Sequence, residues 1–315
     1  MQSKGLFRIL NRMDLMCGLI SSWFEKSGPP IENAHVNTNK FFYNFDLNGS
    51  LNNMQILGQG EYAGDILGKV QQEGIYASVS RYHKHQFNDA WHCHENAHIS
   101  FVLRGGCSEK KKNLYERLPG TTTFYLSGEP HQMVNMHNSL HVNLEMDASF
   151  FNRFGFSEDA FGKTIGRTPD ARFLMLKVYR ELIAADDLAL PSIQMLLLEF
   201  LDRAEKWRYE QNIPEWMRKI HALMNDRWAE TLTLDDLATA AGVHPVTVSH
   251  YFPYYFACTF GAYMRKLKVE KALQLLKSGS SLTETAYTCG FYDQSHFTRA
   301  FKEFTGYLPA YFQKL

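Results

Sequence analysis

The chain has 315 residues, of which 45% are hydrophobic and 21% are charged, and its formal net charge at pH 7 is +0. This balance excludes an intrinsically disordered chain, and the length favours two domains. The five cysteines show no CxxC spacing, which excludes a disulfide framework and a zinc-finger pattern and suits a reducing compartment. Because no apolar run is long enough to span a bilayer, we expect a cytoplasmic protein with no membrane contact.

The first segment, residues 1–53, lacks regular periodicity after Phe24 and contains the turn-forming run Gly28, Pro29 and Pro30. We expect a leader that is disordered or that reflects a start codon called too far upstream, with the folded part beginning at Met54. A docking arm is the alternative that the sequence leaves open.

Residues 54–150 consist of short segments in which apolar residues alternate with others, separated by turn residues. This pattern is typical of strands, and their even spacing favours a small β-barrel or jelly roll. The alternating apolar sets are Ile75, Ala77 and Val79; Ile99, Phe101 and Leu103; Phe124 and Leu126; and Leu140, Val142 and Leu144.

Four histidines of this region, His92, His94, His98 and His131, are the candidate ligand-binding residues. Side chains two or four positions apart on a strand share a face, so the first three would point together and meet the fourth from another strand. Four neutral imidazoles suit a transition metal such as Zn, Fe, Ni or Cu. They equally suit hydrogen bonding to an organic effector.

The stretch WHCHENAHISFVLRGG resembles a cupin-type sensing domain, and the four histidines fall on the metal-binding pattern of cupins. The pattern is altered, because His98 stands where a glutamate is usual and Leu126 where a proline is usual. These changes favour a metal-free pocket for a small-molecule effector, so we expect no cofactor, with a transition metal as the alternative. The carboxylates are scattered, so we expect no catalytic residue and no enzyme.

Residues 151–211 carry two apolar stripes at helical spacing, one from Leu174 to Ala185 and a stronger one from Ile193 to Ala204. They predict a connector of two helices. Periodicity does not name the partner of either stripe, so a homodimer contact and packing against the β domain remain equal alternatives.

Residues 212–315 contain a duplicated pattern. Ala238 and Gly242 recur as Ala286 and Gly290, 48 positions later (286 − 238). Each pair marks a helix followed by a tight turn, which predicts helix-turn-helix units at about 232–253 and 280–303.

One long helix, Phe260–Ser278, is expected between the two units. It would hold them roughly 30 Å apart at about 1.5 Å per residue, close to one turn of DNA.

The second helix of each unit carries the candidate DNA-reading side chains. In the second unit, Phe297, Ala300 and Phe301 form the buried face, and polar groups lie opposite. In the first unit, Pro253 predicts that the helix ends near Phe252, because proline inside a helix costs about 3 kcal/mol. The candidate DNA-binding residues are Thr247, Ser249, His250, Gln294, Ser295, His296, Thr298, Arg299 and Lys302.

The sequence GFYDQSHFTRAFKEFTGYLP, Gly290–Pro309, is similar almost residue for residue to the most diagnostic motif of the AraC/XylS family of transcriptional regulators. The resemblance implies seven helices in the C-terminal region, double-stranded DNA as a partner, a separate sensing domain and a connector that often mediates dimerisation. It also implies a contact with RNA polymerase if the protein is an activator. The first unit departs from the family, because His250, Pro253 and Tyr254 stand where cationic residues are common, so we expect it to bind DNA weakly.

The sequence therefore predicts a two-domain α+β protein with an N-terminal cupin-like β domain, a helical connector and a C-terminal all-α domain. The predicted function is sequence-specific DNA binding modulated by a small-molecule effector. The alternative is a metal-dependent cupin enzyme or a metal sensor fused to a DNA-binding domain. The effector, the operator and the sign of regulation stay open.

Overall fold

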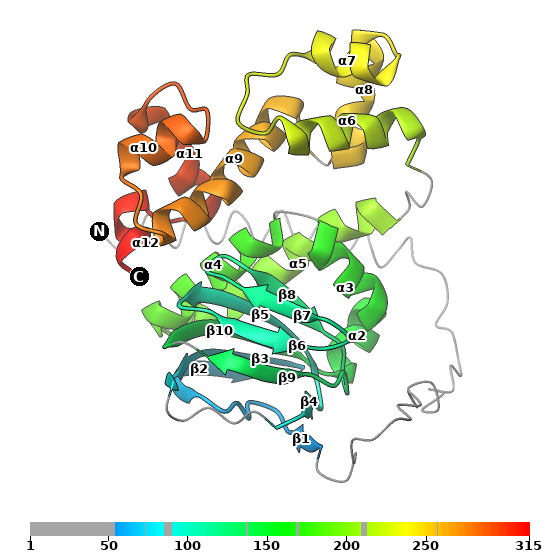
Figure 1. The fold of residues 1–315 in the computed structure, drawn as a ribbon. Coiled ribbons are helices and arrows are strands. Elements are labelled where there is room, and N and C mark those ends of the chain that lie inside the picture. Colours follow the sequence, from blue (N-terminus) through cyan, green and yellow to red (C-terminus); the bar gives the residue numbers. More distant parts are fainter. Residues whose placement is uncertain are drawn as a thin grey trace. The chain divides into compact units, whose positions relative to one another are not determined.

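The computed structural model describes residues 54–72, 74–84, 90–136, 138–167, 170–208, 213–256 and 258–315 (Figure 1). The predicted leader, residues 1–53, lies outside these ranges, and so do residues 209–212 around the end of the predicted connector. Strands occupy the first part of the described chain and helices occupy the rest. This order agrees with the predicted β-rich region followed by a helical region.

The strands pair into three sheets. One has five antiparallel strands in the order β2-β3-β10-β5-β8, another has three in the order β7-β6-β9, and the parallel pair β1-β4 forms the last. The strands are β1 Gln55–Leu57, β2 Asp65–Gln72, β3 Ile75–Tyr82, β4 His92–His94, β5 Ala97–Arg104, β6 Cys107–Lys110, β7 Leu114–Arg117, β8 Thr122–Tyr125, β9 Gln132–Met136 and β10 Ser139–Met146.

The centre of the five-stranded sheet is β10, which is buried along its whole length. Successive side chains of β10 point to opposite faces of the sheet, and in its middle part apolar residues alternate with polar ones. Leu140, Val142 and Leu144 enter the main hydrophobic core, whereas His141 and Asn143 line a pocket on the other face. This alternation makes one face of the sheet the core and the other the floor of a polar site.

The four predicted strand segments are present as parts of β3, β5, β8 and β10. Strand β4 corresponds to the strand expected at His92 and His94. Apart from the strand expected near His131, the other strands were not predicted, because most are short and lack strict alternation. Among the described residues the strands form separate sheets and no closed barrel, so the structure supports a β-rich domain and not the finer expectation of a barrel or jelly roll.

Four helices follow the strands where two were predicted. The two predicted stripes correspond to α4 and α5. The additional helices are short: Asp147 caps the first of them with its side chain, and Gly155 ends it in the left-handed conformation. The bounds are α2 Ala148–Phe154, α3 Glu158–Arg167, α4 Asp170–Ala184 and α5 Ala189–Arg208.

The C-terminal region contains the seven helices α6 to α12, the number that the family resemblance implies. Side-chain caps at Thr233, Thr259, Ser281 and Asp293 define where four of them begin. The bounds are α6 Glu215–Asp226, α7 Leu234–Ala241, α8 Pro245–Phe256, α9 Phe260–Lys277, α10 Leu282–Thr288, α11 Gln294–Thr305 and α12 Pro309–Lys314.

The expectation that α8 ends near Phe252 is wrong. The helix continues to Phe256 with Pro253 inside it. The rings of Phe252 and Phe256 lie 4.4 Å apart, and Phe256 also contacts Tyr263 of α9 at 4.8 Å. Packing of this last turn outweighs the backbone hydrogen bond that proline removes.

Two hydrophobic cores divide the helices. The smaller core joins α6, α7, α8 and the first half of α9, with Ile220, Leu237 and Leu267 among its buried residues. The larger core runs from the five-stranded sheet through α4 and α5 to the second half of α9 and to α10, α11 and α12. Within the described ranges, no helix is both long enough and apolar enough to cross a membrane.

Charged contacts also join α4 to α9. Lys266 lies 2.8 Å from Asp170, and Arg172 is paired with Glu270. The ring of Phe173 on α4 stacks on Phe304 of α11 at 5.6 Å. Helix α4 therefore packs in the same core as the sheet and also contacts α9 and α11.

Candidate functional site

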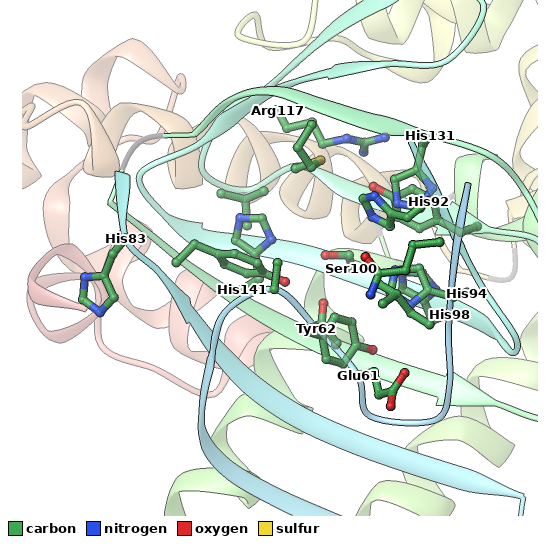
Figure 2. A pocket seen from close by; sticks show the side chains of 18 residues that line it. Glu61, Tyr62, His83, His92, His94, His98, Ser100, Arg117, His131 and His141 are labelled. Carbon is green, nitrogen blue, oxygen red and sulfur yellow. The ribbon is translucent and has the colours of Figure 1, made fainter. Parts of the chain in front are cut away.

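A pocket of about 420 Å³ lies over the polar face of the five-stranded sheet (Figure 2). Its floor comes from alternate residues of β5 and β10, and its walls come from β4, from the segment around Tyr62 and from the strands of the smaller sheet. The volume is within the range of small-molecule sites, about 300–1,000 Å³. Its lining includes Tyr62, Ser100, Arg117, Tyr125 and His141, together with the four predicted histidines His92, His94, His98 and His131.

The structure brings all four predicted histidines to this pocket. The ring centroids of His92 and His131 lie 4.3 Å apart, and those of His94 and His98 also lie 4.3 Å apart. Backbone hydrogen bonds of 2.9 Å in both directions between His92 and His131 hold their strands together. The expected meeting across strands is therefore found for His92 and His94 with His131.

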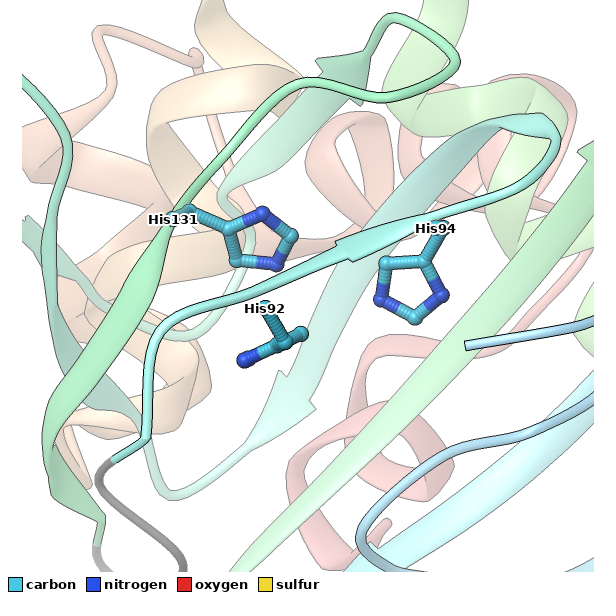
Figure 3. Close-up of side chains that lie close together, drawn as sticks. All are labelled: His92, His94 and His131. Atoms are coloured by element: carbon cyan, nitrogen blue, oxygen red, sulfur yellow. The ribbon is translucent and has the colours of Figure 1, made fainter. Parts of the chain in front are cut away.

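Three of them form a tighter group (Figure 3). One ring nitrogen from each of His92, His94 and His131 lies within 4.8 Å of the other two. A cation placed between three such nitrogens would have three imidazole ligands and an open side toward the pocket, an arrangement that Zn²⁺ and other transition metals accept.

The tautomers of two members follow from their partners. Nδ1 of His92 lies 3.1 Å from the carbonyl oxygen of Ala90, and Nδ1 of His131 lies 3.0 Å from that of Glu129. A carbonyl oxygen only accepts, so each Nδ1 must donate and carry the proton, which leaves the lone pair on Nε2. Nδ1 of His94 is buried without a hydrogen-bond partner among the described residues.

Burial keeps these imidazoles neutral. It lowers the pKa of His94 to about 3 and the pKa of His92 and His131 below the ordinary value, with the neighbouring histidines adding to the effect for His94 and His131. Neutral imidazole is the form that binds a metal or accepts a hydrogen bond from a ligand.

The fourth histidine, His98, differs from the expectation that it shares a strand face with His92 and His94. The chain turns at Glu95 and Asn96, so His98 belongs to β5 and lies outside the group of three. Its ring stacks on Tyr125 at 4.4 Å with planes 9° apart. Burial lowers the pKa of His98 well below the usual value.

Several pocket residues were missed from the sequence. His141 is buried, lies 2.7 Å from the hydroxyl of Ser139, and has a pKa lowered to about 3 by burial. Arg117 is buried and paired with Glu109, so the one guanidinium that lines the pocket already has a counter-ion. The available signal was the presence of polar residues at alternate positions of strands whose other positions are strongly apolar.

The two helix-turn-helix units are built on the same plan, with one difference in the turn. Gly242 and Gly290 both have positive φ, 70° and 66°. The next helix starts three positions after the first glycine, at Pro245, and four positions after the second, at Gln294. The second turn is therefore one residue longer, and its Tyr292 is 87% exposed.

Beyond the turns, α8 and α11 align with an offset of 49 residues. Val248 and Phe252 of α8 are buried, and so are Phe297 and Phe301 of α11 (297 − 248 = 301 − 252 = 49). This common packing fixes which residues of each helix face outward. On the outward side the pairs are Val246 and Ser295, Ser249 and Thr298, His250 and Arg299, Pro253 and Lys302, and Tyr254 and Glu303.

The outward face of α11 is polar and carries two cations. Arg299 and Lys302 are exposed, and Gln294 accepts a 2.8 Å hydrogen bond from the hydroxyl of Thr283 on α10. Of the predicted DNA-binding residues on this helix, Gln294, Ser295, His296, Arg299 and Lys302 are exposed and Thr298 is half-buried. The outward face of α8 includes the predicted Ser249 and His250, both exposed, with Thr247 half-buried.

Comparisons with known proteins identify the C-terminal region. The family described as "Helix-turn-helix domain" matches residues 237–314. The chain is 35% identical over 94 residues to the HTH-type transcriptional regulator GbdR of Pseudomonas aeruginosa, a match that covers 30% of this chain and 26% of that protein. It is 27% identical over 116 residues to the HTH-type transcriptional activator RhaS of Escherichia fergusonii, covering 36% of this chain and 42% of RhaS.

The chain therefore spans less than half the length of these curated relatives. Among solved structures, the C-terminal domain of AraT, a response regulator from Geobacillus stearothermophilus, is 25% identical, with a TM-score of 0.32 over 33% of this chain and 88% of that one. A TM-score of this size adds no argument about function.

Proposed function

Since the C-terminal part of this chain is an AraC-type helix-turn-helix domain, we propose that the whole protein is a sequence-specific DNA-binding transcriptional regulator controlled by a small molecule. The effector site is the pocket over the sheet, in a cupin-type sensing domain of residues 54–150. The matched relatives are named as transcriptional regulators, in agreement with the expectation that the protein is not an enzyme.

The observation that carries the effector part of the proposal is the chemistry of the pocket. Burial keeps its histidines His92, His94, His98 and His131 neutral, and its arginine is neutralised by Glu109. A pocket with many hydrogen-bonding groups and little net charge fits a neutral or weakly charged polar molecule, because burying an unpaired charge there would be costly. Tyr62 supplies a hydroxyl at the rim, where it donates to Glu145 at 2.7 Å.

The route from this pocket to DNA runs through β10, α4 and α9. The apolar face of β10, the face opposite the pocket, belongs to the same core as α4, α9 and α11. The ion pairs of Asp170 and Arg172 with α9 add polar contacts to this connection. An effector changes DNA binding only if it binds unequally to two arrangements of these helices.

Sequencing of the genomic fragments that the purified full-length protein retains, with and without candidate metabolites, tests the proposal. We expect a small set of enriched sites whose retention changes with one compound. Ser100→Leu narrows the pocket floor and should keep DNA retention while removing the response to the compound. Arg299→Ala is the reverse control, because it should lose DNA affinity and keep compound binding.

We also propose where the protein acts and which macromolecules it contacts. The protein acts in the cytoplasm, and it contacts RNA polymerase if it is an activator. Because the apolar stripes of α4 and α5 are buried in the core with the sheet, a homodimer contact would use other surface of the connector. The oligomeric state in solution and the effect on transcription in a reconstituted system test the last two.

A second candidate, metal sensing, is favoured by the group of His92, His94 and His131. Two of these histidines have Nδ1 fixed by backbone carbonyls, which presents Nε2 as a ligand, and this is the support that metal-binding histidines usually have. His94 adds a buried ring nitrogen with no partner among the described residues. The residues present therefore fit a transition metal, which would act as the effector or hold it.

Elemental analysis of protein purified without an affinity tag separates the two candidates. The organic-effector candidate predicts metal well below one equivalent, and the metal candidate predicts about one. His94→Ala should then lose the metal and its contribution to thermal stability. His83→Ala is the matched control, because His83 also lines the pocket but is paired with Asp65 at 3.2 Å and lies away from the other histidines (Figure 2).

A further inference from the structure

The outward face of α8 carries no charge. Helix α8, Pro245–Phe256, contains no lysine, arginine, aspartate or glutamate. Five of its exposed residues recur at positions i, i+3, i+4, i+7 and i+8 and form one continuous stripe, and Tyr251, which is also exposed, lies beside it. The stripe consists of Val246, Ser249, His250, Pro253 and Tyr254.

The stripe occupies the position at which α11 presents Arg299 and Lys302. The offset of 49 residues aligns the buried residues of the two helices, so their exposed stripes face outward in the same way. A helix in this position of a helix-turn-helix unit enters the major groove and contacts base edges with its N-terminal residues. In α8 the second residue is Val246, which is 67% exposed.

The major groove offers a valine only one kind of favourable partner. Guanine, adenine and cytosine present hydrogen-bonding groups there, whereas thymine adds a C5-methyl group. Apolar contact with that methyl group removes both surfaces from water, and it needs no charge on the protein.

We infer that α8 recognises thymine through its C5-methyl group, with Val246 as the residue that determines specificity. This inference rests on the proposed function. It implies that the two halves of the DNA site, one bound by α8 and one by α11, are recognised by different kinds of contact. Helix α11 reads its half-site with hydrogen bonds and charge, and α8 reads a thymine-containing half-site by apolar contact. Tyr254, 62% exposed at the other end of the stripe, is placed to donate its hydroxyl to a phosphate.

The test begins with selection of binding sites from a random duplex library by the full-length protein. In the selected site, each thymine is then replaced singly by uracil, which removes the methyl group and leaves the base-pairing edge unchanged. We expect about a fourfold loss of affinity at one or two thymines of the half-site read by α8. Val246→Ser should bind the thymine site more weakly and lose most of the difference between thymine and uracil.

Two controls keep the result specific. Val246→Thr retains one methyl group and should retain part of the discrimination, and unchanged thermal unfolding shows that each variant is folded. In Arg299→Ala the overall affinity should fall while the uracil effect at the α8 half-site persists. If uracil has no effect, or if its effect survives in Val246→Ser, the inference is wrong although the regulator proposal stands. If no DNA sequence is enriched at all, both fail.

Discussion

The two helix-turn-helix units have the same backbone plan but different surroundings. The first unit, α7 and α8, packs with α6 and the first half of α9 in a core of its own. The second unit, α10 and α11, shares its core with α4, α5 and the five-stranded sheet. The first unit also lacks charge on its outward helix, whereas the second has two cations there. A duplicated motif has thus become one unit with an uncharged outward helix and a core of its own, and another unit with a charged outward helix and a core continuous with the β-rich region.

The largest effect that tests this comparison is truncation of one buried phenylalanine in each unit. Phe252→Ala and Phe301→Ala should each cost about 3–5 kcal/mol, because both rings are essentially inaccessible. Hydrogen exchange should then separate them. Phe252→Ala should raise exchange mainly in α6, α7 and α8, and Phe301→Ala should raise it in α10 to α12 and also in α4. Equal spread of both effects over the whole chain would contradict the existence of two cores.

The turn glycines give the next largest contrast. At Gly290 a Cβ atom would overlap the backbone carbonyl oxygen of Ala229, whereas nothing lies within 4 Å of the corresponding position at Gly242. Gly242→Ala should therefore cost about 1 kcal/mol for the left-handed conformation alone, and Gly290→Ala about 3 kcal/mol. Chemical denaturation of the two variants measures the difference. Similar values would show that the chain relaxes around Gly290.

Charge on the reading helices is tested by the aligned pair His250 and Arg299. Arg299→Ala should weaken binding to the selected DNA site by about 1–3 kcal/mol and relax base preference if its guanidinium bonds a base. His250→Ala should cost less. Binding titrations at several salt concentrations measure both, and a larger loss for His250→Ala would reverse the assignment of the charged unit as the main reader.

The smallest contrast lies in the helix caps. Thr233 and Asp236 form a reciprocal capping box at the start of α7, whereas Ser281 makes a single side-chain cap at the start of α10. Thr233→Ala should destabilise the first unit by about 1–2 kcal/mol and Ser281→Ala the second by about 1 kcal/mol or less. Thermal unfolding of the two variants, with Thr239→Ala as a mid-helix control, checks the order.

The sequence was sufficient where a local signal sets the structure. Gly242 ends α7 and Gly290 lies in the turn after α10 as predicted, because a left-handed glycine acts within one turn of helix. It was insufficient for the end of α8, where contacts of Phe256 with Tyr263 on another helix decide the outcome. The hydrophobic periodicity of a single helix does not predict which residues of another helix it will contact.

The pocket shows the same division. Spacing correctly placed His92 and His94 on one side of a strand, because the strand period of two is a local rule. The meeting with His131, which is distant in the sequence, was expected from the resemblance to the cupin pattern and not from spacing. Spacing misplaced His98, since a turn at Glu95 ends the strand before it. The carbonyl groups that fix the imidazole tautomers belong to the backbone. Their positions cannot be predicted from residue types, because every residue has a carbonyl group.

The parallel pairing of β1 with β4 allows ligand binding in the pocket to be followed by the rate of proteolysis at β1. Gln55 and Leu57 of β1 line the pocket, and β1 is held against β4 by bonds such as Glu95 N–H to the carbonyl of Leu57 at 2.8 Å. A strand of three residues has few bonds to break, so its opening sets how often a protease reaches the peptide bonds around Leu57. A ligand that contacts β1 would slow that cleavage in proportion to its occupancy, so a digestion time course reports effector binding without any DNA present.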